Sequence, residues 1–218
     1  MTQASSLLRM MQTGDSAFPS GAFAFSNGLE TLLVEGVVPG RMDLPTVLME
    51  QIGPRWLSFD RAFLHAAMGA ADAAEIDRDC HVRQGVPELA AASQRMGRAL
   101  LTSHARIATP GAAEYLALPR EVAPGHAPVV QGLVGRGLGL APAEAEVAAF
   151  HGLLSGFAAA AVRLGRLGAL NAQRLVGEAI TRFAPAFETP PGPPSAFAPV
   201  ADIAAQRRDP AAVNLFAT

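Results

Sequence analysis

Apolar residues recur at helical spacing through most of this 218-residue chain, and that spacing restricts the folds open to it. Between Pro87 and Ile107, for instance, Leu89, Met96 and Leu100 fall on one side of a helix. No long run alternates apolar and polar residues as a half-buried strand does, and no repeat of fixed period occurs. The sequence therefore predicts an all-α fold, a single domain over residues 1–218 built as a bundle of roughly eight to ten helices.

Caps, glycines and prolines set the expected helix boundaries. Asp43 is placed to cap a long helical region in which Gly53 and Pro54 should produce a kink or a split. A Pro-rich break near 189–199 precedes a last short helical turn and a C-terminal tail, 207–218. Other helices are expected at residues 4–14, 29–36, 71–82, 87–107, 128–140, 142–167 and 171–187.

Composition excludes several classes of function. All 17 basic residues are Arg and the chain has no Lys, so it contains neither a Walker A loop nor a Schiff-base lysine. Cys80 is the only cysteine, which excludes internal disulfides and multi-thiolate zinc sites. The net charge of −2 is not that of a typical nucleic-acid-binding protein, which carries an excess of positive charge.

The low content of charged residues indicates a protein partner instead. Half of the residues are apolar and 17% are charged, against a usual charged fraction of roughly 25%. We therefore expect part of the surface to be buried in an obligate interface. The longest segment without Asp, Glu, Lys or Arg, 147–162, is too short to span a membrane, and residues 1–15 lack the pattern of a secretory signal. A cytoplasmic protein without a membrane span is expected.

The stretch GDSAFPSGAFAFSNGLE, residues 14–30, is open to three interpretations: a nucleophilic serine, a phosphate-binding glycine loop, or a loop that docks on another protein. Neither Ser16 nor Ser26 lies in a complete G-x-S-x-G pattern after a strand, and glycines seven residues apart do not bring their amides together. In a second glycine-rich run, GLVGRGLGL at 132–140, the glycines lie inside and at the end of a helix. That position favours close helix packing and a helix stop over phosphate binding.

Metal binding has one candidate segment. No two histidines stand three or four residues apart, the spacing that places two ligands on one helical face; the five are His65, His81, His104, His126 and His151. In the run DRDCH, Asp77, Cys80 and His81 would share one face of a helix. These residues form either a metal site or a solvated polar surface.

A stripe of small residues marks another candidate contact. Gly152, Gly156 and Ala160 recur every four residues on an expected helix that also carries Phe150 and Phe157. Such a stripe permits close approach by a second helix. The helix is either the centre of the domain's own core or the seam of a dimer.

Four segments of this chain resemble the UreF family of urease accessory proteins, and they occur in the family's order over most of the chain. The segments are DSAFPSGAFAFSNGLETLLVEG, RMGRALL, HAPVVQGLVGRGLGL and AVRLGRLGALNAQRLV. The resemblance implies a helical, dimeric, non-catalytic protein without a cofactor of its own. It also implies a role in nickel insertion, in which the protein bridges the D (or H) accessory protein and the nickel-carrying GTPase, the G component, on the urease apoprotein and modulates the GTPase.

The resemblance favours the docking interpretation of residues 14–30. Pro19 and Gly21 would set a turn that leaves Phe18, Phe23 and Phe25 available for burial or docking. Glu30 matches the family's GLE. It either completes a helix cap with Asn27 or presents its carboxylate to a partner.

Two arginines and the C-terminal tail complete the set of partner-binding candidates. Arg163 and Arg174 lie in the fourth segment, and an i,i+4 pair with Glu178 is the alternative role for Arg174. Leu215 and Phe216 keep the apolar anchor of a family tail that is implied to order against the D/H partner.

This tail departs from the family pattern around its apolar anchor. Arg208 replaces a His, and Asn214 and Ala217 stand where arginines are usual, so flanking basic contacts are lost. Two other functions remain open: a small helical metal-binding protein or enzyme that uses the Asp77–His81 cluster, and a helical interaction module outside the urease pathway.

Overall fold

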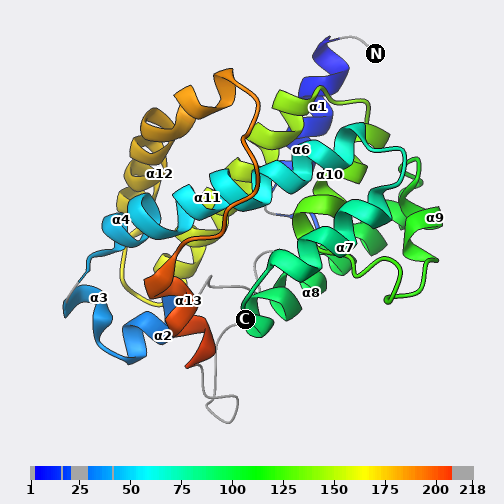
Figure 1. Cartoon of the computed structure of the whole chain (residues 1–218). Helices are drawn as coiled ribbons and strands as arrows, with labels where there is room; N and C mark the ends of the chain where they lie inside the picture. Colours follow the sequence, from blue (N-terminus) through cyan, green and yellow to red (C-terminus); the bar gives the residue numbers. More distant parts are fainter. Residues whose placement is uncertain (1–2, 16, 21–28, 41, 208–218) are drawn as a thin grey trace.

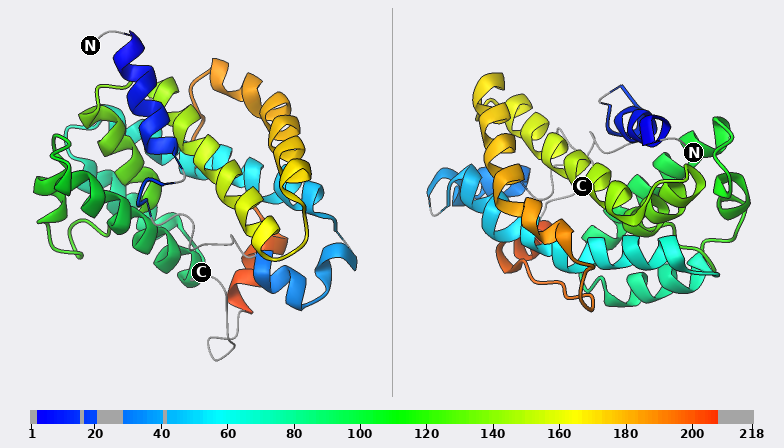
Figure 2. Two further views of the ribbon diagram at one scale, coloured as in Figure 1. Left: turned by 180° about the vertical axis from the view of Figure 1, so that it is seen from behind. Right: turned by 90° about the horizontal axis from the view of Figure 1, so that it is seen from above.

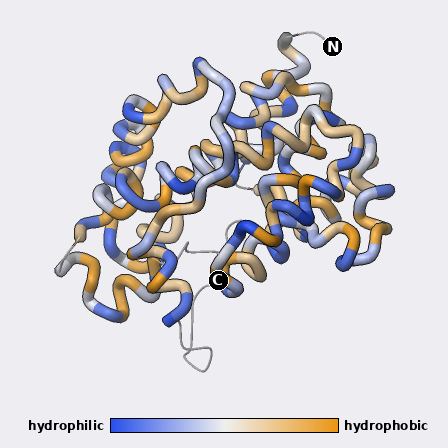
Figure 3. Tube along the Cα trace, viewed as in Figure 1, coloured by the Kyte–Doolittle hydropathy of each residue, from blue (hydrophilic) through white to orange (hydrophobic). Residues whose placement is uncertain are grey.

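The computed structural model describes residues 3–15, 17–20, 29–40 and 42–207, and every regular element among them is a helix (Figure 1). This confirms the predicted all-α class. Figure 2 shows α12 at one end of the molecule and α9 at the other, with the long helices between them. Along the helices apolar residues alternate with polar ones, as Figure 3 shows, because each helix buries only one side.

The N-terminal part forms α1 (Gln3–Gly14), α2 (Leu29–Val34) and α3 (Val37–Gly40). Leu29 and Leu32 of α2 are fully buried, and α2 packs against the C-terminal helix α13 (Pro199–Gln206). Elements from the N-terminal and C-terminal parts of the chain therefore pack against each other. The expected stop at Gly36 is confirmed, since Gly36 has a φ of +69°, which favours glycine.

The helical region after Asp43 does not split at Gly53 and Pro54, so the split, one of the two expected outcomes, is wrong; π-helical stretches lie on both sides of Gly53–Arg55 instead. Asp43 caps it as predicted, since its Oδ1 accepts a 2.8 Å hydrogen bond from the Thr46 amide. The chain then runs on through α4 (Leu44–Thr46), a π-helical stretch (Val47–Ile52), α5 (Gly53–Arg55), a second π-helical stretch (Trp56–Asp60) and α6 (Arg61–Gly69).

The wider π turns explain why Pro54 is tolerated. Proline lacks an amide hydrogen, and its ring clashes with the carbonyl four residues earlier in an ordinary helix. Here the Gly53 amide bonds to Leu48 O, five residues back, and the Arg61 amide bonds to Trp56 O in the same way. The backbone at Ile52, Gly53 and Arg55 stays in the right-handed helical region. The helix therefore accommodates Pro54 by spacing its hydrogen bonds five residues apart on both sides, and the backbone does not break.

The middle of the chain packs α10 against both α6 and α8. The elements of this part are α7 (Ala73–Arg83), α8 (Pro87–Arg106), α9 (Ala112–Leu116) and α10 (Ala127–Gly137). A Cβ at Gly132 would lie 2.4 Å from Leu64 O of α6, so only glycine permits this helix crossing. Gly139, with a φ of +68°, follows the end of α10. The close-packing interpretation of the glycine run is thus confirmed.

The C-terminal part places α11 (Pro142–Arg163) against α12 (Ala169–Phe183), α10 and α1. The elements that follow are a short 3-10 helix (Ala184–Glu188) and α13. The ring of Phe150 lies 5.0 Å from Trp56 and 5.4 Å from Phe183, and Leu154 and Phe157 are fully buried. The aromatic side chains thus form the centre of the core beside α11.

A buried ion pair fastens the chain after α12 to the core. Arg61 Nε lies 2.6 Å from Glu146 Oε2, and both side chains are at most 5% exposed. The same guanidinium donates to Ala186 O at 2.7 Å and to Thr189 O at 2.5 Å. His65 Nδ1 is 2.6 Å from the other oxygen of Glu146. One guanidinium of α6 therefore links α11 to two carbonyl groups of the segment that follows α12.

Candidate docking surface and central cleft

The segment after α1 is tied down on α8. The ring of Phe18 packs 4.9 Å from the ring of His104, and Ser103 Oγ donates a 2.7 Å hydrogen bond to Pro19 O. Asp15 Oδ1 accepts from the Ala17 amide at 2.7 Å, which forms the turn. Phe18 is half-buried within the chain, whereas Pro19 is exposed. Gly21, Phe23 and Phe25 lie outside the described residues, as do Ser16 and Ser26.

Glu30 is buried in the first turn of α2, with 8% of its surface exposed. A carboxylate at a helix start is favoured by the helix dipole, in keeping with a capping role. Because so little of Glu30 is exposed, a partner that binds its carboxylate would meet only a small part of this side chain. Asn27, the other member of the expected cap, lies outside the described residues.

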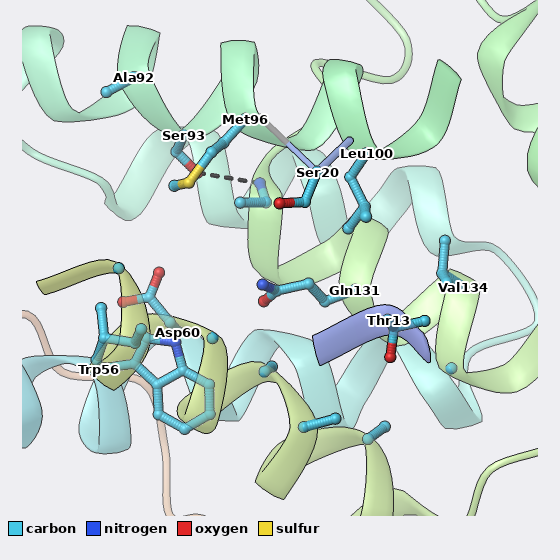
Figure 4. Close-up of a pocket in the computed structure, with 18 of the residues that line it drawn as sticks. Thr13, Ser20, Trp56, Asp60, Ala92, Ser93, Met96, Leu100, Gln131 and Val134 are labelled. Carbon is cyan, nitrogen blue, oxygen red and sulfur yellow. Dashed lines mark hydrogen bonds between the residues drawn. The ribbon is translucent and has the colours of Figure 1, made fainter. Parts of the chain in front are cut away.

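A cleft of about 200 Å³ opens between α1, α8, α10 and α11 (Figure 4). Its walls are mainly apolar, with Met96 and Leu100 from α8 and Val134 from α10, and Gln131 projects into it. A cavity of this kind is a usual place for a ligand or a partner's side chain.

The predicted small-residue stripe lies partly along this cleft. Gly152 and Gly156 line it, and a Cβ added at either would meet nothing within 4 Å. No helix of the described chain therefore packs closely on the two glycines. Ala160, one turn further along, is fully buried. The core-helix interpretation holds for Ala160, whereas Gly152 and Gly156 have no close neighbour in the part of the chain that the structure describes.

One end of the cleft is polar. Arg55 Nη1 lies 3.0 Å from Asp60 Oδ2, and Arg55 Nη2 donates to Gln84 Oε1 at 3.1 Å. Asp202 of α13 lies 3.9 Å from Arg55 Nε. Burial raises the pKa of Asp60, and the charge of Arg55 opposes that rise. The end of the cleft therefore presents a guanidinium that is already engaged by carboxylates.

His104 lines the cleft with an imidazole that is fully removed from solvent. Its Nδ1 lies 2.9 Å from Thr109 Oγ1, and its Nε2 has no hydrogen-bond partner among the described residues. Burial lowers the pKa of His104 to about 4, so the ring is neutral at neutral pH.

The prediction that Asp77, Cys80 and His81 together bind a metal ion is wrong. Asp77 is fully buried, and its carboxylate accepts hydrogen bonds from Tyr115 Oη at 2.7 Å, from the Gly125 amide at 2.6 Å and from the His126 amide at 3.0 Å. Cys80 is also fully buried, and burial raises the pKa of its thiol. Of the three predicted ligands, only His81 is exposed.

Asp77 therefore organises the backbone before α10, and neither a shared metal face nor a solvated surface describes Asp77 and Cys80. Asp77 and His126 are 49 residues apart in the chain, so the spacing within DRDCH gives no signal for this contact. Among the described residues no group of three or more His, Cys, Asp and Glu side chains is arranged to hold a metal ion.

The two predicted arginines are exposed on the antiparallel pair α11 and α12. Arg163 ends α11, and Arg174 Nη1 donates to Asn171 Oδ1 at 3.2 Å, not to Glu178. Exposed apolar side chains accompany them; Val162, Leu170 and Ile180 are on this pair, and Leu7, Leu8 and Met11 are on α1. Leu215 and Phe216 lie outside the described residues.

Within the described chain, α11 is the one helix with the length and hydropathy to cross a membrane. It buries Phe150, Leu154 and Phe157 against neighbouring helices of the same fold. A core helix satisfies the same criteria, so this feature is weak evidence for a span.

Comparison with known proteins agrees with the sequence resemblance. A model of the UreF family matches residues 39–180, more than half of the chain. The chain belongs to the UreF family. The urease accessory protein UreF of Trichodesmium erythraeum is 31% identical over 180 residues, which cover 78% of this chain and 76% of that protein. UreF 1 of Brucella melitensis is 32% identical over 190 residues, 84% of this chain and 78% of that protein. UreF of an Arthrobacter species is 31% identical over 183 residues, 83% of this chain and 81% of that protein.

Proposed function

We propose that this UreF-family chain is a non-catalytic maturation factor for urease. The observation that carries the proposal is family membership over most of the chain, among relatives named urease accessory proteins. In its finer form, the chain bridges the D/H accessory protein and the nickel-carrying GTPase during nickel insertion, modulates that GTPase, and acts in the cytoplasm as a homodimer.

The surface chemistry supports a role in binding proteins. Leu8 and Met11 on α1 and Leu170 on α12 are each more than 60% exposed, on a chain with only 17% charged residues. Exposed apolar side chains of this size lower the free energy of a complex when a partner covers them. Arg163 and Arg174 stand on the same α11–α12 pair, and arginine is frequent among interface residues that contribute most to binding.

Co-expression of the tagged chain with its own D/H and G components tests the proposal, with size-exclusion chromatography and light scattering as the readout. We expect a complex that contains all three proteins. A chain that elutes alone in the presence of both components would contradict the bridging function.

Two variants locate the surface. Arg163→Ala and Arg174→Ala should each weaken the complex and change the free energy of unfolding by at most about 0.5 kcal/mol, because both side chains are exposed. Arg95→Ala, on the exposed side of α8, is the matched control and should leave assembly unchanged. Equal complex formation by all three variants would remove the α11–α12 pair from the proposed interface.

A further inference from the structure

Three polar side chains from three helices converge beside the buried Asp77. His81 Nδ1 lies 3.1 Å from His126 Nε2, and the side-chain amide nitrogen of Gln94 lies 3.2 Å from the first and 3.4 Å from the second. His81 stands in the last turn of α7, Gln94 on α8 and His126 at the start of α10. His126 is fully buried, whereas His81 is exposed, so the cluster is open to solvent on one side.

Hydrogen bonds alone leave this triangle incompletely satisfied. A neutral imidazole nitrogen either donates one hydrogen or accepts one, and it cannot do both. If one ring donates to the other, the donating nitrogen also faces the amide hydrogens of Gln94. If Gln94 donates to both rings, two lone pairs face each other at 3.1 Å. Each arrangement leaves at least one edge of the triangle repulsive, at a site where unpaired polar atoms are costly.

The spacing of the three atoms matches that of the ligands of one metal ion. Zinc binds imidazole nitrogen at about 2.0–2.1 Å, and two such ligands are separated by about 2.9 Å in an octahedral site and about 3.4 Å in a tetrahedral one. The observed edges of 3.1, 3.2 and 3.4 Å fall in that interval. Rotation of the Gln94 amide by half a turn replaces its nitrogen with the carbonyl oxygen, an oxygen ligand, in the same position.

The surrounding contacts hold in place the backbone that carries one of the three groups, His126. Asp77 accepts hydrogen bonds from the amides of Gly125 and His126, and Ser93 Oγ accepts from the Ala127 amide at 3.1 Å. A Cβ at Gly97 would lie 2.1 Å from Gly125 O, so α8 touches the backbone that carries His126. A ligand on a backbone fixed in this way loses little freedom when it binds an ion.

The local charges are compatible with a cation. The negative end of the α7 dipole is at His81, and the Asp77 carboxylate lies behind the His126 backbone. The start of α10 opposes a cation, since helix N-termini carry a partial positive charge. The carboxylate and the α7 terminus together offset that opposition.

We propose that His81, Gln94 and His126 bind one divalent transition-metal ion of the zinc, nickel or cobalt class. The ligands are His81 Nδ1, His126 Nε2 and the Gln94 carbonyl oxygen, and water completes the coordination. Imidazole suits these ions, whereas magnesium and calcium prefer oxygen ligands throughout. Asp77 and Cys80 contribute no ligand. The site does not depend on the urease proposal, because a single purified chain forms it.

The test uses the untagged, chelator-stripped chain titrated with Co²⁺, followed by its visible absorption and by calorimetry, and repeated with Zn²⁺ and Ni²⁺. We expect one ion per chain. His81→Ala should weaken binding by at least about tenfold, since it removes a nitrogen ligand from an exposed position that the fold does not need. The matched control, His151→Ala on the exposed side of α11, should bind as the wild type does.

A gain of affinity separates a metal site from a structural cluster. Gln94→Glu keeps the shape of the side chain and supplies an ionised oxygen, so it should tighten binding by about tenfold or more. A merely structural role for Gln94 predicts no such gain. Absence of binding by the wild type, or unchanged affinity in both His81→Ala and Gln94→Glu, would overturn the proposal.

Discussion

Replacing Gly132 with alanine tests whether the α6–α10 crossing is as tight as described. The new Cβ would lie 2.4 Å from Leu64 O and 2.9 Å from the Ala67 Cβ. Carbon and carbonyl oxygen atoms approach no closer than about 3.3 Å in ordinary contacts. Because the oxygen belongs to the backbone, a change of rotamer does not relieve the clash. The two helices must separate by about 0.9 Å at this point.

The expected cost follows from two opposing effects. Forcing a group into a packed core typically costs about 1–3 kcal/mol, whereas alanine gains about 1 kcal/mol over glycine in a helix interior. Separation of the helices also loosens the fully buried Val129 and Leu64 beside the crossing. We therefore expect a net destabilisation of about 1–2 kcal/mol, which lowers Tm by about 2–8 °C in a domain of this size.

Urea unfolding followed by far-ultraviolet circular dichroism measures this effect. The matched control is Gly177→Ala on the exposed side of α12, where an added Cβ meets nothing within 4 Å. That variant should be as stable as the wild type or up to about 1 kcal/mol more stable. If Gly132→Ala unfolds at the same urea concentration as Gly177→Ala, the close approach of α6 and α10 is refuted.

Two further predictions concern buried ionisable groups. Glu146→Ala leaves the Arg61 guanidinium buried without its carboxylate, and we expect a loss of about 3–5 kcal/mol in the free energy of unfolding by urea titration. The exposed Glu178→Ala is its control, expected to be within about 0.5 kcal/mol of the wild type, and equal stability of both would show that the pair is not buried. His104 has a pKa lowered by burial to about 4, whereas an unfolded histidine titrates near its usual 6.5. The unfolded state thus binds the extra proton first, so this contribution is present above pH 6.5 and is lost as the pH falls toward 4, by at most about 3 kcal/mol. In metal-free protein His104→Gln should reduce the drop in stability between pH 7 and pH 4.5, and an unchanged drop would refute the assignment.

Local signals in the sequence were sufficient for most helices. Asp43, Pro87 and Pro142 stand at the starts that the structure confirms, because caps and N-terminal prolines act within one turn. The short α9 was not predicted. Its five residues, Ala112–Leu116, are too few to show a period, and packing on α8 stabilises it.

Contacts between residues far apart in the chain could not be predicted from the sequence. Asp77 looked like a surface carboxylate or a ligand because its partners Tyr115, Gly125 and His126 come 38 to 49 residues later. The His81–His126 contact joins residues 45 positions apart. Helical spacing predicts what shares a face of one helix, but it carries no information on which helices meet.

The two π-helical stretches between Asp43 and Ala70 have a consequence for how this protein tolerates changes in length. A π turn holds one residue more than the α turn it replaces, while the flanking faces keep their orientation. A single-residue deletion inside Val47–Ile52 would therefore tighten that turn and leave Trp56 and Phe63 directed toward the same neighbours. The same deletion in the middle of α10 would rotate every later side chain of that helix by about 100°. We therefore expect relatives to have single-residue gaps within Val47–Ile52 and not in the middle of α10.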